Sequence, residues 1–298
     1  MSAWTGSDTL PTERRRLSDF VALTKPRITF LVVLTALVGF LAAGRGGRAG
    51  DLVLLARTLA GTALVAGAAS ALNQWAERDA DALMRRTVRR PLPAGRLVPR
   101  EGALFGAVLA AGGTAYLALT VGVLAAALAA ATAASYLLVY TPLKRVTSLA
   151  TVVGAVPGAI PPMIGWAAVR GRLDAGAWVL FLILFFWQMP HFLALAAMYR
   201  RDYARAGFRI LSVVDPDGAS TGRQSVVYAL ALLPVSLGPA FLGMAGPVYF
   251  FGALALGLGF LGYGVRFALH PGSRPHAAGL FHYSLLYLPA LCTLMALG

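Results

Sequence analysis

The strongest constraint on the fold of this chain is a series of apolar segments long enough to cross a lipid bilayer. A transmembrane helix needs about 20 mostly apolar residues. Nine segments of the sequence meet that requirement, although a weak boundary between the third and fourth leaves eight as an alternative count. They lie at approximately 28–44, 52–75, 103–119, 121–140, 149–169, 177–199, 226–244, 248–265 and 278–297. With 58% hydrophobic and 13% charged residues, the chain is predicted to be an all-α, polytopic membrane protein.

Basic residues concentrate in alternate gaps between these segments. If the N-terminus is cytoplasmic, 21 of the 26 Lys and Arg residues lie on the cytoplasmic side, four lie on the other side, and Arg57 lies within the second segment. This is the positive-inside pattern of membrane proteins. Topology therefore explains the net charge of +14, and we expect no nucleic acid as a partner. The two large charged gaps, 76–100 and 200–224, are expected to open on one cytoplasmic face as two halves of a site.

The N-terminal residues lack the apolar segment that directly follows the charges of a cleaved export signal. Residues 1–26 are predicted to form a cytoplasmic tail, and residues 27–298 to form a transmembrane domain. The predicted location is the inner (plasma) membrane of the cell, with the N-terminus and the active-site face in the cytoplasm.

The densest block of charge, NQWAERDADALMRRTVRRP, covers residues 73–91. Asn73, Glu77 and Asp81 recur every four residues, so they lie on one stripe if the preceding helix continues through them. Such oxygen ligands suit Mg²⁺, which binds through one or two carboxylates together with a substrate's phosphates. Several arginines follow, and guanidinium groups bind phosphate oxygens in pairs. The block indicates a metal-bridged diphosphate; the alternative is a solvated helix end with ordinary salt bridges.

Three longer strings resemble the UbiA-type intramembrane prenyltransferases, in the form found in the heme branch of that family. They are NQWAERDADALMRRTVRRPLPAGR at 73–96, YTPLKRVTSLATVVGAVPGAIPPMIGWAA at 140–168 and FWQMPHFLALAAMYRRDYARAG at 186–207. The resemblance implies that residues 27–298 are a UbiA-type domain, a bundle of nine transmembrane helices around a central cavity open to the membrane.

The activity implied by this resemblance is an Mg²⁺-dependent prenyl transfer. The farnesyl group of farnesyl diphosphate is joined to a vinyl group of heme b, water is added, and heme O and diphosphate are released. The partners implied are farnesyl diphosphate, heme b as substrate and the lipid bilayer. The sequence leaves open whether the chain also docks to a downstream heme A synthase.

By position, the resemblance implies that Asn73, Glu77 and Asp81 hold the metal and the diphosphate. Asp202 matches the first acidic residue of the family's second motif. These four are therefore the expected catalytic and metal-binding residues. Ala206 stands where many members of the family have a second Asp, so the second acidic motif of this chain has fewer carboxylates than is usual in the family.

The same region departs from the family at two further positions. Arg209 and Ser212 stand where the resemblance implies proline at one or both positions, and the conformation of this loop is left open.

The expected substrate-binding residues are basic or aromatic. Arg86 and Arg90 lie four apart, on one helical face if the helix persists, and are assigned to the diphosphate oxygens with Lys144 and Arg145. For Arg145 the positive-inside bias alone is the better interpretation. The full set of expected substrate-binding residues is Arg86, Arg90, Lys144, Arg145, Arg201, His191, Trp187 and Tyr140.

His191 is the only histidine well inside a predicted span. An ionisable residue within the membrane is a functional candidate, and imidazole could ligate the heme iron or hydrogen-bond a propionate. The alternative is a packed histidine bonded to a carbonyl. Trp187 and Tyr140 could turn their π faces to a carbocation, or could serve only in packing.

Two other functions compete with this interpretation. One keeps the prenyl transfer but changes the acceptor to an aromatic acid or a quinone precursor. The other is a transporter of an anionic lipid or metabolite, which the absence of a convincing internal repeat and the acids adjoining arginines on one face disfavour.

Overall fold

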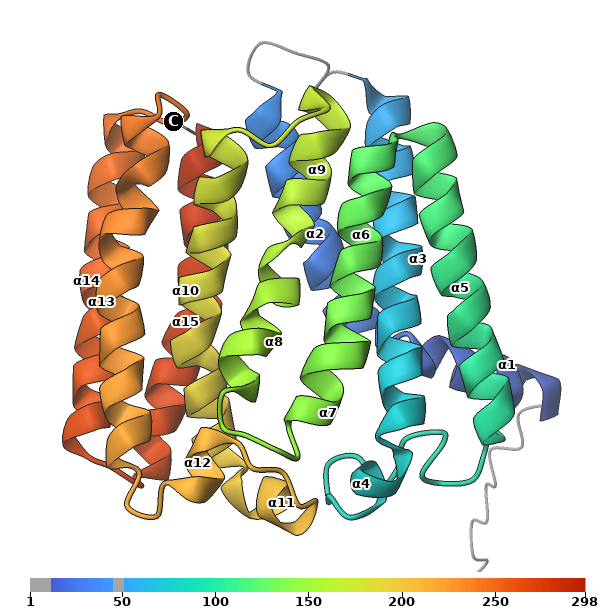
Figure 1. Ribbon diagram of the computed structural model, residues 1–298. Coiled ribbons are helices and arrows are strands. Elements are labelled where there is room, and N and C mark those ends of the chain that lie inside the picture. The colour runs from blue at the N-terminus through green and yellow to red at the C-terminus, as the bar shows by residue number, and fades with distance from the viewer. Residues whose placement is uncertain (1–11, 45–50, 298) are drawn as a thin grey trace, which may run out of the picture.

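The computed structural model describes residues 12–44 and 51–297, and within these ranges every regular element is a helix. Nine described stretches are long and apolar enough to cross a membrane, which confirms the predicted count and removes the alternative of eight. They are α2 (Pro26–Ala43), α3 (Leu52–Ala76), α5 (Pro99–Thr120), Val123–Leu143, Ala150–Arg170, α10 (Ala175–Met198), α13 (Ala219–Phe241), α14 (Pro247–Leu269) and α15 (Arg274–Leu297). Figure 1 shows these helices standing side by side.

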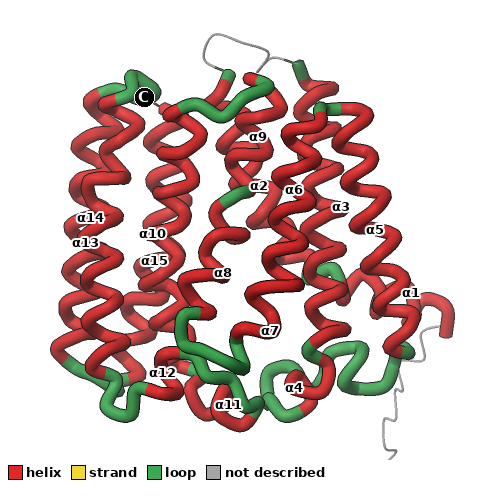
Figure 2. Tube along the Cα trace, in the orientation of Figure 1, coloured by secondary structure: helices red, strands yellow, loops and turns green. Residues whose placement is uncertain are grey.

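Two of the nine spans are interrupted. The fourth divides into α6 (Val123–Ala134), the π-helical turn η2 (Ser135–Tyr140) and α7 (Thr141–Leu143). The fifth divides into α8 (Ala150–Ala159) and α9 (Pro161–Arg170). The second break occurs because proline cannot donate to the preceding turn but is tolerated in the first turn of a new helix. Figure 2 shows it as a short loop partway along the bundle.

Helices α2 and α9 approach closely because each presents a glycine to the backbone of the other. A Cβ atom on Gly39 would overlap the carbonyl group of Pro162, and one on Gly165 would overlap the carbonyl oxygen of Ala36. Small residues allow such backbone contact between membrane helices. Neither glycine can therefore be enlarged without moving α2 and α9 apart.

The described part of the predicted tail is folded. Helix α1 (Thr12–Leu23) lies across the lower end of the bundle (Figure 1). Leu23 is fully buried, and its carbonyl oxygen accepts a hydrogen bond from Gln74 Nε2 at 2.7 Å. Asp19 accepts a hydrogen bond from Arg96 Nε at 2.9 Å. Within the segment predicted as a cytoplasmic tail, Asp19 and Leu23 therefore dock α1 on the rest of the chain; residues 1–11 lie outside the described ranges.

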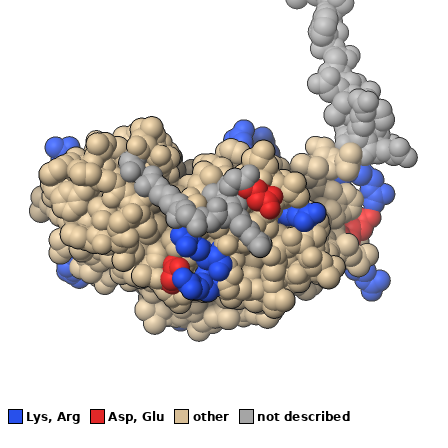
Figure 3. Space-filling view, turned by 90° about the horizontal axis from the view of Figure 1, so that it is seen from above, with Lys and Arg blue, Asp and Glu red and all other residues tan. Residues whose placement is uncertain are grey.

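The short helices gather at the same lower end as α1. They are α4 (Arg78–Ala82), α11 (Arg200–Arg205) and α12 (Leu211–Val214). The opposite end, seen from above in Figure 3, is covered mostly by uncharged side chains, with Lys, Arg, Asp and Glu in small groups. The charged segments between the spans therefore meet at one end of the bundle.

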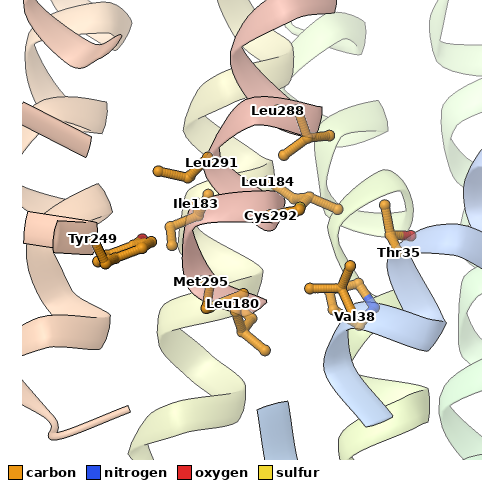
Figure 4. Close-up of a pocket in the computed structure, with 11 residues that line it drawn as sticks. Thr35, Val38, Leu180, Ile183, Leu184, Tyr249, Leu288, Leu291, Cys292 and Met295 are labelled. Atoms are coloured by element: carbon orange, nitrogen blue, oxygen red, sulfur yellow. The ribbon is translucent and has the colours of Figure 1, made fainter. Parts of the chain in front are cut away.

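A small apolar cavity lies between α2, α10, α14 and α15 (Figure 4). Its volume is about 20 Å³, and Thr35, Leu184, Leu288 and Cys292 are among the side chains that line it. Asp, Glu, Lys and Arg are absent from its lining. This cavity is therefore a packing defect of the apolar interior, away from the charged end of the bundle.

Candidate active site

The acidic residues of the first charged block lie where α3 gives way to α4. Asn73 is in the last turn of α3, Glu77 stands between the helices, and Asp81 is in α4. The helix breaks at Glu77, whose φ is −103°. Even so, the N–H groups of Glu77 and Asp81 donate to carbonyl oxygens four residues back, at 2.9 and 2.8 Å. The predicted stripe survives the break, and the three residues are only 2%, 6% and 1% exposed.

Asn73 is held by two other segments of the chain. Its Oδ1 accepts a hydrogen bond from Lys25 Nζ at 3.2 Å, and its Nδ2 donates to Thr141 Oγ1 at 3.2 Å. Thr141 Oγ1 donates its own hydrogen to the carbonyl oxygen of Tyr136 at 2.8 Å, so it can only accept from Asn73. This fixes the amide orientation and turns the oxygen of Asn73 toward the cations of the site.

Each carboxylate of this block is paired with a cation. Glu77 forms an ion pair with Lys144, and Asp81 Oδ2 accepts a hydrogen bond from Arg90 Nη1 at 2.6 Å. Lys144 is itself only 7% exposed. Buried charges are tolerated when they are paired and hydrogen-bonded. Lys25, Arg90 and Lys144 come from three different segments, so the tertiary fold assembles this buried acid–cation cluster.

Lys25 is a residue of this cluster that the sequence analysis missed. It stands between α1 and α2 with a φ of 48°, a left-handed conformation that costs a non-glycine residue about 1 kcal/mol or more. Burial, together with the neighbouring Arg90 and Lys144, lowers the pKa of Lys25 to about 7. The sequence signal was Pro26, because a residue before proline is disfavoured in a helix. That signal marks the break but not the direction of the side chain.

The second charged gap meets the first at the lower end of the bundle. Met84 packs in one apolar cluster with Phe208 and Ile210. The N–H of Arg209 donates to the carbonyl oxygen of Lys144 at 2.7 Å. The prediction that the two gaps lie together on one face is confirmed by these contacts (Figure 1).

Asp202 occupies the second half of this region. It lies in α11, is 9% exposed, and forms an ion pair with Arg205 of the same helix. Across the described residues, no three His, Cys, Asp or Glu side chains lie close enough together to hold one metal ion. The four predicted ligands are therefore arranged as two halves, with Asp202 apart from Glu77 and Asp81.

The first half offers the donors that Mg²⁺ prefers, an amide oxygen and two carboxylates on one buried stripe. Within the described part of the chain their charges are balanced by Lys144, whose Nζ pairs with Glu77 Oε1, and by Arg90, whose Nη1 donates to Asp81 Oδ2. The oxygen donors of Asn73, Glu77 and Asp81 therefore fit a divalent cation.

Arg86 and Arg90 do not share a helical face, because residues 83–97 form turns and the helix on which that prediction depended does not continue. Arg90 meets Asp81, whereas Arg86 Nη2 donates to Tyr203 OH at 2.8 Å and its guanidinium lies 4.9 Å from the centre of the Tyr203 ring. Arg90 therefore binds an acidic residue of the first charged gap, whereas Arg86 binds an aromatic residue of the second.

The remaining predicted substrate-binding residues divide between the interior and the surface. Lys144 Nζ lies 4.6 Å from the centre of the Tyr140 ring, so both residues belong to the buried acid–cation cluster. Arg145 and Arg201 are exposed. The surface position of Arg145 agrees with the positive-inside alternative.

His191 and Trp187 form a separate group between α10 and α15. The His191 ring stacks on those of Trp187 and Phe281, at 5.1 and 4.8 Å between centres. Ser284 Oγ lies 2.7 Å from His191 Nδ1 and donates its hydrogen to the carbonyl oxygen of Phe281 at 2.5 Å. With the Ser284 hydrogen directed to that carbonyl, Nδ1 carries the proton that Ser284 accepts, and Nε2 keeps its lone pair. The partner of this histidine is a hydroxyl, not the carbonyl of the packing alternative.

A nine-helix membrane bundle that gathers buried carboxylates and cations at one end is the architecture expected of an intramembrane prenyltransferase. Residues 32–286 match the UbiA prenyltransferase family, and the chain belongs to this family. Protoheme IX farnesyltransferase of Solibacter usitatus (strain Ellin6076) is 49% identical over 94% of this chain and 98% of that protein. Protoheme IX farnesyltransferase of Koribacter versatilis (strain Ellin345) is 44% identical over 94% of this chain and 93% of that protein.

Solved structures share the fold at low sequence identity. A structure described in a study of digeranylgeranylglyceryl phosphate synthase in membranes has a TM-score of 0.80 at 15% identity, over 95% of this chain and 98% of that chain. A UbiA homologue from Archaeoglobus fulgidus bound to DMAPP and Mg²⁺ has a TM-score of 0.64 at 15% identity, over 94% and 100% of the two chains. These likenesses establish the helical bundle independently of the sequence motifs.

Proposed function

We propose that this chain transfers the farnesyl group of farnesyl diphosphate to a vinyl group of heme b, with addition of water, giving heme O and diphosphate. The observation that carries the proposal is the buried acid–cation cluster, in a chain whose relatives at 43–49% identity are named protoheme IX farnesyltransferase. Its carboxylates and cations suit a diphosphate that must be bound, neutralised and released.

The leaving group is handled by the first half of the site. Asn73, Glu77 and Asp81 would hold Mg²⁺, with Asp202 contributing to a second ion. Mg²⁺ supplies neutralisation of the negative charge that develops on the diphosphate. Lys144 and the other cations of the cluster bind the diphosphate oxygens and orient the first farnesyl carbon toward the apolar interior.

The reaction forms a carbon–carbon bond and a carbon–oxygen bond, and it breaks the carbon–oxygen bond to diphosphate, the π bond of the vinyl group and one O–H bond of water. The bond between the first farnesyl carbon and its diphosphate oxygen breaks, and its electron pair leaves with diphosphate. The π electrons of the heme vinyl group attack the farnesyl cation, and water captures the new cation and loses a proton. Burial of Glu77 and Asp81 keeps bulk water away from the first cation.

The aromatic residues take different parts in this scheme. The face of Tyr140 already meets Lys144, so Tyr140 positions a diphosphate-binding cation. Trp187 stacks on His191 and donates Nε1–H to the carbonyl oxygen of Ser284 at 2.8 Å, which holds the imidazole. The unprotonated Nε2 of His191 is then suited to ligate the iron of heme b.

The same proposal includes location and orientation. The end that carries α4, α11 and α12 faces the cytoplasm across the inner (plasma) membrane, which the concentration of 21 of the 26 Lys and Arg residues on that side supports. A downstream heme A synthase is the proposed consumer of heme O.

The test is an assay of the full chain in membranes with heme b, farnesyl diphosphate and Mg²⁺, followed by mass spectrometry of the extracted hemes. We expect a heme heavier by one farnesyl group and one water, absent when a chelator is added. Prenylation of an aromatic acid or quinone precursor without any modified heme would refute the acceptor while keeping the diphosphate site. Uptake of an anion without a covalent product would instead favour a transporter.

A further inference from the structure

A second pocket, with polar side chains in its lining, lies between residues of α10, α11, α12, α13, α14 and α15. Figure 1 shows α11 and α12 at the lower end of the bundle. The volume of the pocket is about 60 Å³, several times the roughly 10–15 Å³ needed to hold one water molecule. None of Asn73, Glu77, Asp81 and Asp202 lines it. The pocket is therefore distinct from the candidate active site and has room for a small polyatomic group.

Two arginines line this pocket from different helices. Arg200 begins α11, and its Nη1 donates to the carbonyl oxygen of Pro216 at 2.9 Å, which holds the guanidinium in place and leaves further donors on it. Arg274 begins α15 and is exposed. Neither forms an ion pair with a carboxylate in the described part of the chain. Two such cations at one pocket repel each other, and an anion between them relieves that repulsion.

Ser212 gives an independent sign of a ligand. It lines the pocket, is 3% exposed, and its hydroxyl has no hydrogen-bond partner among the described residues. A buried hydroxyl without a partner is unfavourable. An oxygen-bearing anion in the pocket would accept a hydrogen bond from it.

The nearest acidic residues of this region are engaged elsewhere. Asp215 Oδ2 accepts hydrogen bonds from the backbone N–H and the hydroxyl of Thr221, both at 2.7 Å, and Asp217 Oδ1 accepts one from the N–H of Ala219 at 3.0 Å. Both carboxylates cap the start of α13, and neither lines the pocket. Their charges are thus directed toward the helix, not toward the space between the arginines.

Two glycines close the pocket with backbone. Gly218 and Gly272 have φ values of 78° and 75°, and a Cβ atom on Gly218 would lie 2.8 Å from the backbone nitrogen of Gly272. The loops before α13 and α15 can approach this closely only because a side chain is absent there. The arrangement brings Arg200 and Arg274 to one small space.

We propose that this pocket binds a phosphate group, either from the headgroup of a membrane phospholipid or free in solution. The bound phosphate would be held by Arg200, Arg274 and the hydroxyl of Ser212. It would tie α11 and α12 to the start of α15. Because α11 carries Asp202, phosphate would also fix the second half of the candidate active site. This site goes beyond the proposed prenyl transfer, and its binding can be measured without turnover.

The test uses the full chain in detergent, with binding followed by native mass spectrometry and by the unfolding temperature. The probes are inorganic phosphate, phosphatidylglycerol, and diacylglycerol as a lipid without phosphate. We expect saturable binding of phosphate or phosphatidylglycerol that weakens on the order of ten-fold in Arg274→Gln. Arg266→Gln is the matched control, because Arg266 is exposed in the last turn of α14 and does not line the pocket.

Ser212→Ala separates binding from folding. Its unfolding temperature without phosphate should match or exceed that of the wild type, since an unpaired hydroxyl is removed, while its phosphate affinity should fall. A response to inorganic phosphate identifies the free anion as sufficient, and a response to phosphatidylglycerol alone identifies the headgroup. Absence of saturable binding to both, equal binding of diacylglycerol, or equal weakening in Arg266→Gln would overturn the proposal.

Discussion

The first charged gap, residues 76–100, and the second, residues 200–224, both bring acidic side chains to the lower end of the bundle, but in different surroundings. In the first, Glu77 and Asp81 are almost fully buried, and each is paired with a cation. In the second, Asp202 meets an arginine of its own short helix, whereas Asp215 caps α13. The contrast suggests that the first gap carries most of the chemistry, and that the second mainly positions loops.

The largest effect should come from Asp81→Asn, which keeps the size of the side chain but removes its charge. If Asp81 holds Mg²⁺ as proposed, loss of its carboxylate should lower kcat by about 100-fold or more, because several kcal/mol of charge stabilisation are at stake. The measurement is the rate of heme O formation in membranes at matched protein levels.

Asp79→Asn is the control for that substitution. Asp79 lies two residues away, and its side chain is 79% exposed and 3.6 Å from Arg78, so its variant should keep near wild-type activity. Comparable losses of activity in Asp79→Asn and Asp81→Asn would mean that only the total negative charge of residues 73–91 matters. The proposed distinction between the buried Asp81 and the exposed Asp79 would then be wrong.

Lys144→Met tests whether the ion pair between Lys144 and Glu77 of the first gap stabilises the fold. It leaves Glu77 buried without its cation, and breaking a buried pair in this way costs about 3 kcal/mol. We expect a clearly lower unfolding temperature in detergent. The double variant Lys144→Met with Glu77→Gln should recover most of that stability but not activity. A stable single variant would show that the pair contributes little to folding.

Much of the fold could be predicted from the sequence, because hydrophobic length is a local property of the chain. The nine spans and the meeting of the two charged gaps both follow from apolar runs and from the distribution of Lys and Arg. The docking of α1 could not be predicted in this way. It depends on contacts between Leu23 and Gln74, which are far apart in the sequence.

In the candidate site, too, features set by local sequence could be predicted, and features set by contacts between distant residues could not. The common stripe of Asn73, Glu77 and Asp81 could be predicted because their spacing of four survives the end of α3. Lys25 was missed because its place in the cluster depends on one left-handed residue between two helices. A shared face of Arg86 and Arg90 depended on a helix that continues past Asp81, and residues 83–97 form turns instead.

Asp202→Asn tests the second charged gap in the same way. The Asp202–Arg205 pair is local, and the side chain of Arg205 is 45% exposed although that of Asp202 is only 12% exposed, so loss of the pair should lower the unfolding temperature less than loss of the Lys144–Glu77 pair. If Asp202 contributes to a second metal ion, kcat/KM should fall about 10-fold, less than for Asp81→Asn. The measurement is the dependence of turnover on Mg²⁺ concentration, which should shift upward in the variant. An unchanged dependence would remove Asp202 from metal binding.

The smallest effect is expected for Asp215→Ala, which removes a helix cap from the second gap. Burial alone would raise the pKa of Asp215, but the hydrogen bonds from Thr221 and Ser220 lower it below its ordinary value. The ionised carboxylate therefore contributes stability above the unfolded pKa of about 3.9, and that contribution is lost as pH falls through the lower folded pKa. The variant should lose about 1 kcal/mol at neutral pH and converge with the wild type in acid. A constant difference in unfolding temperature across this pH range would show that packing, not the charged cap, is what Asp215 provides.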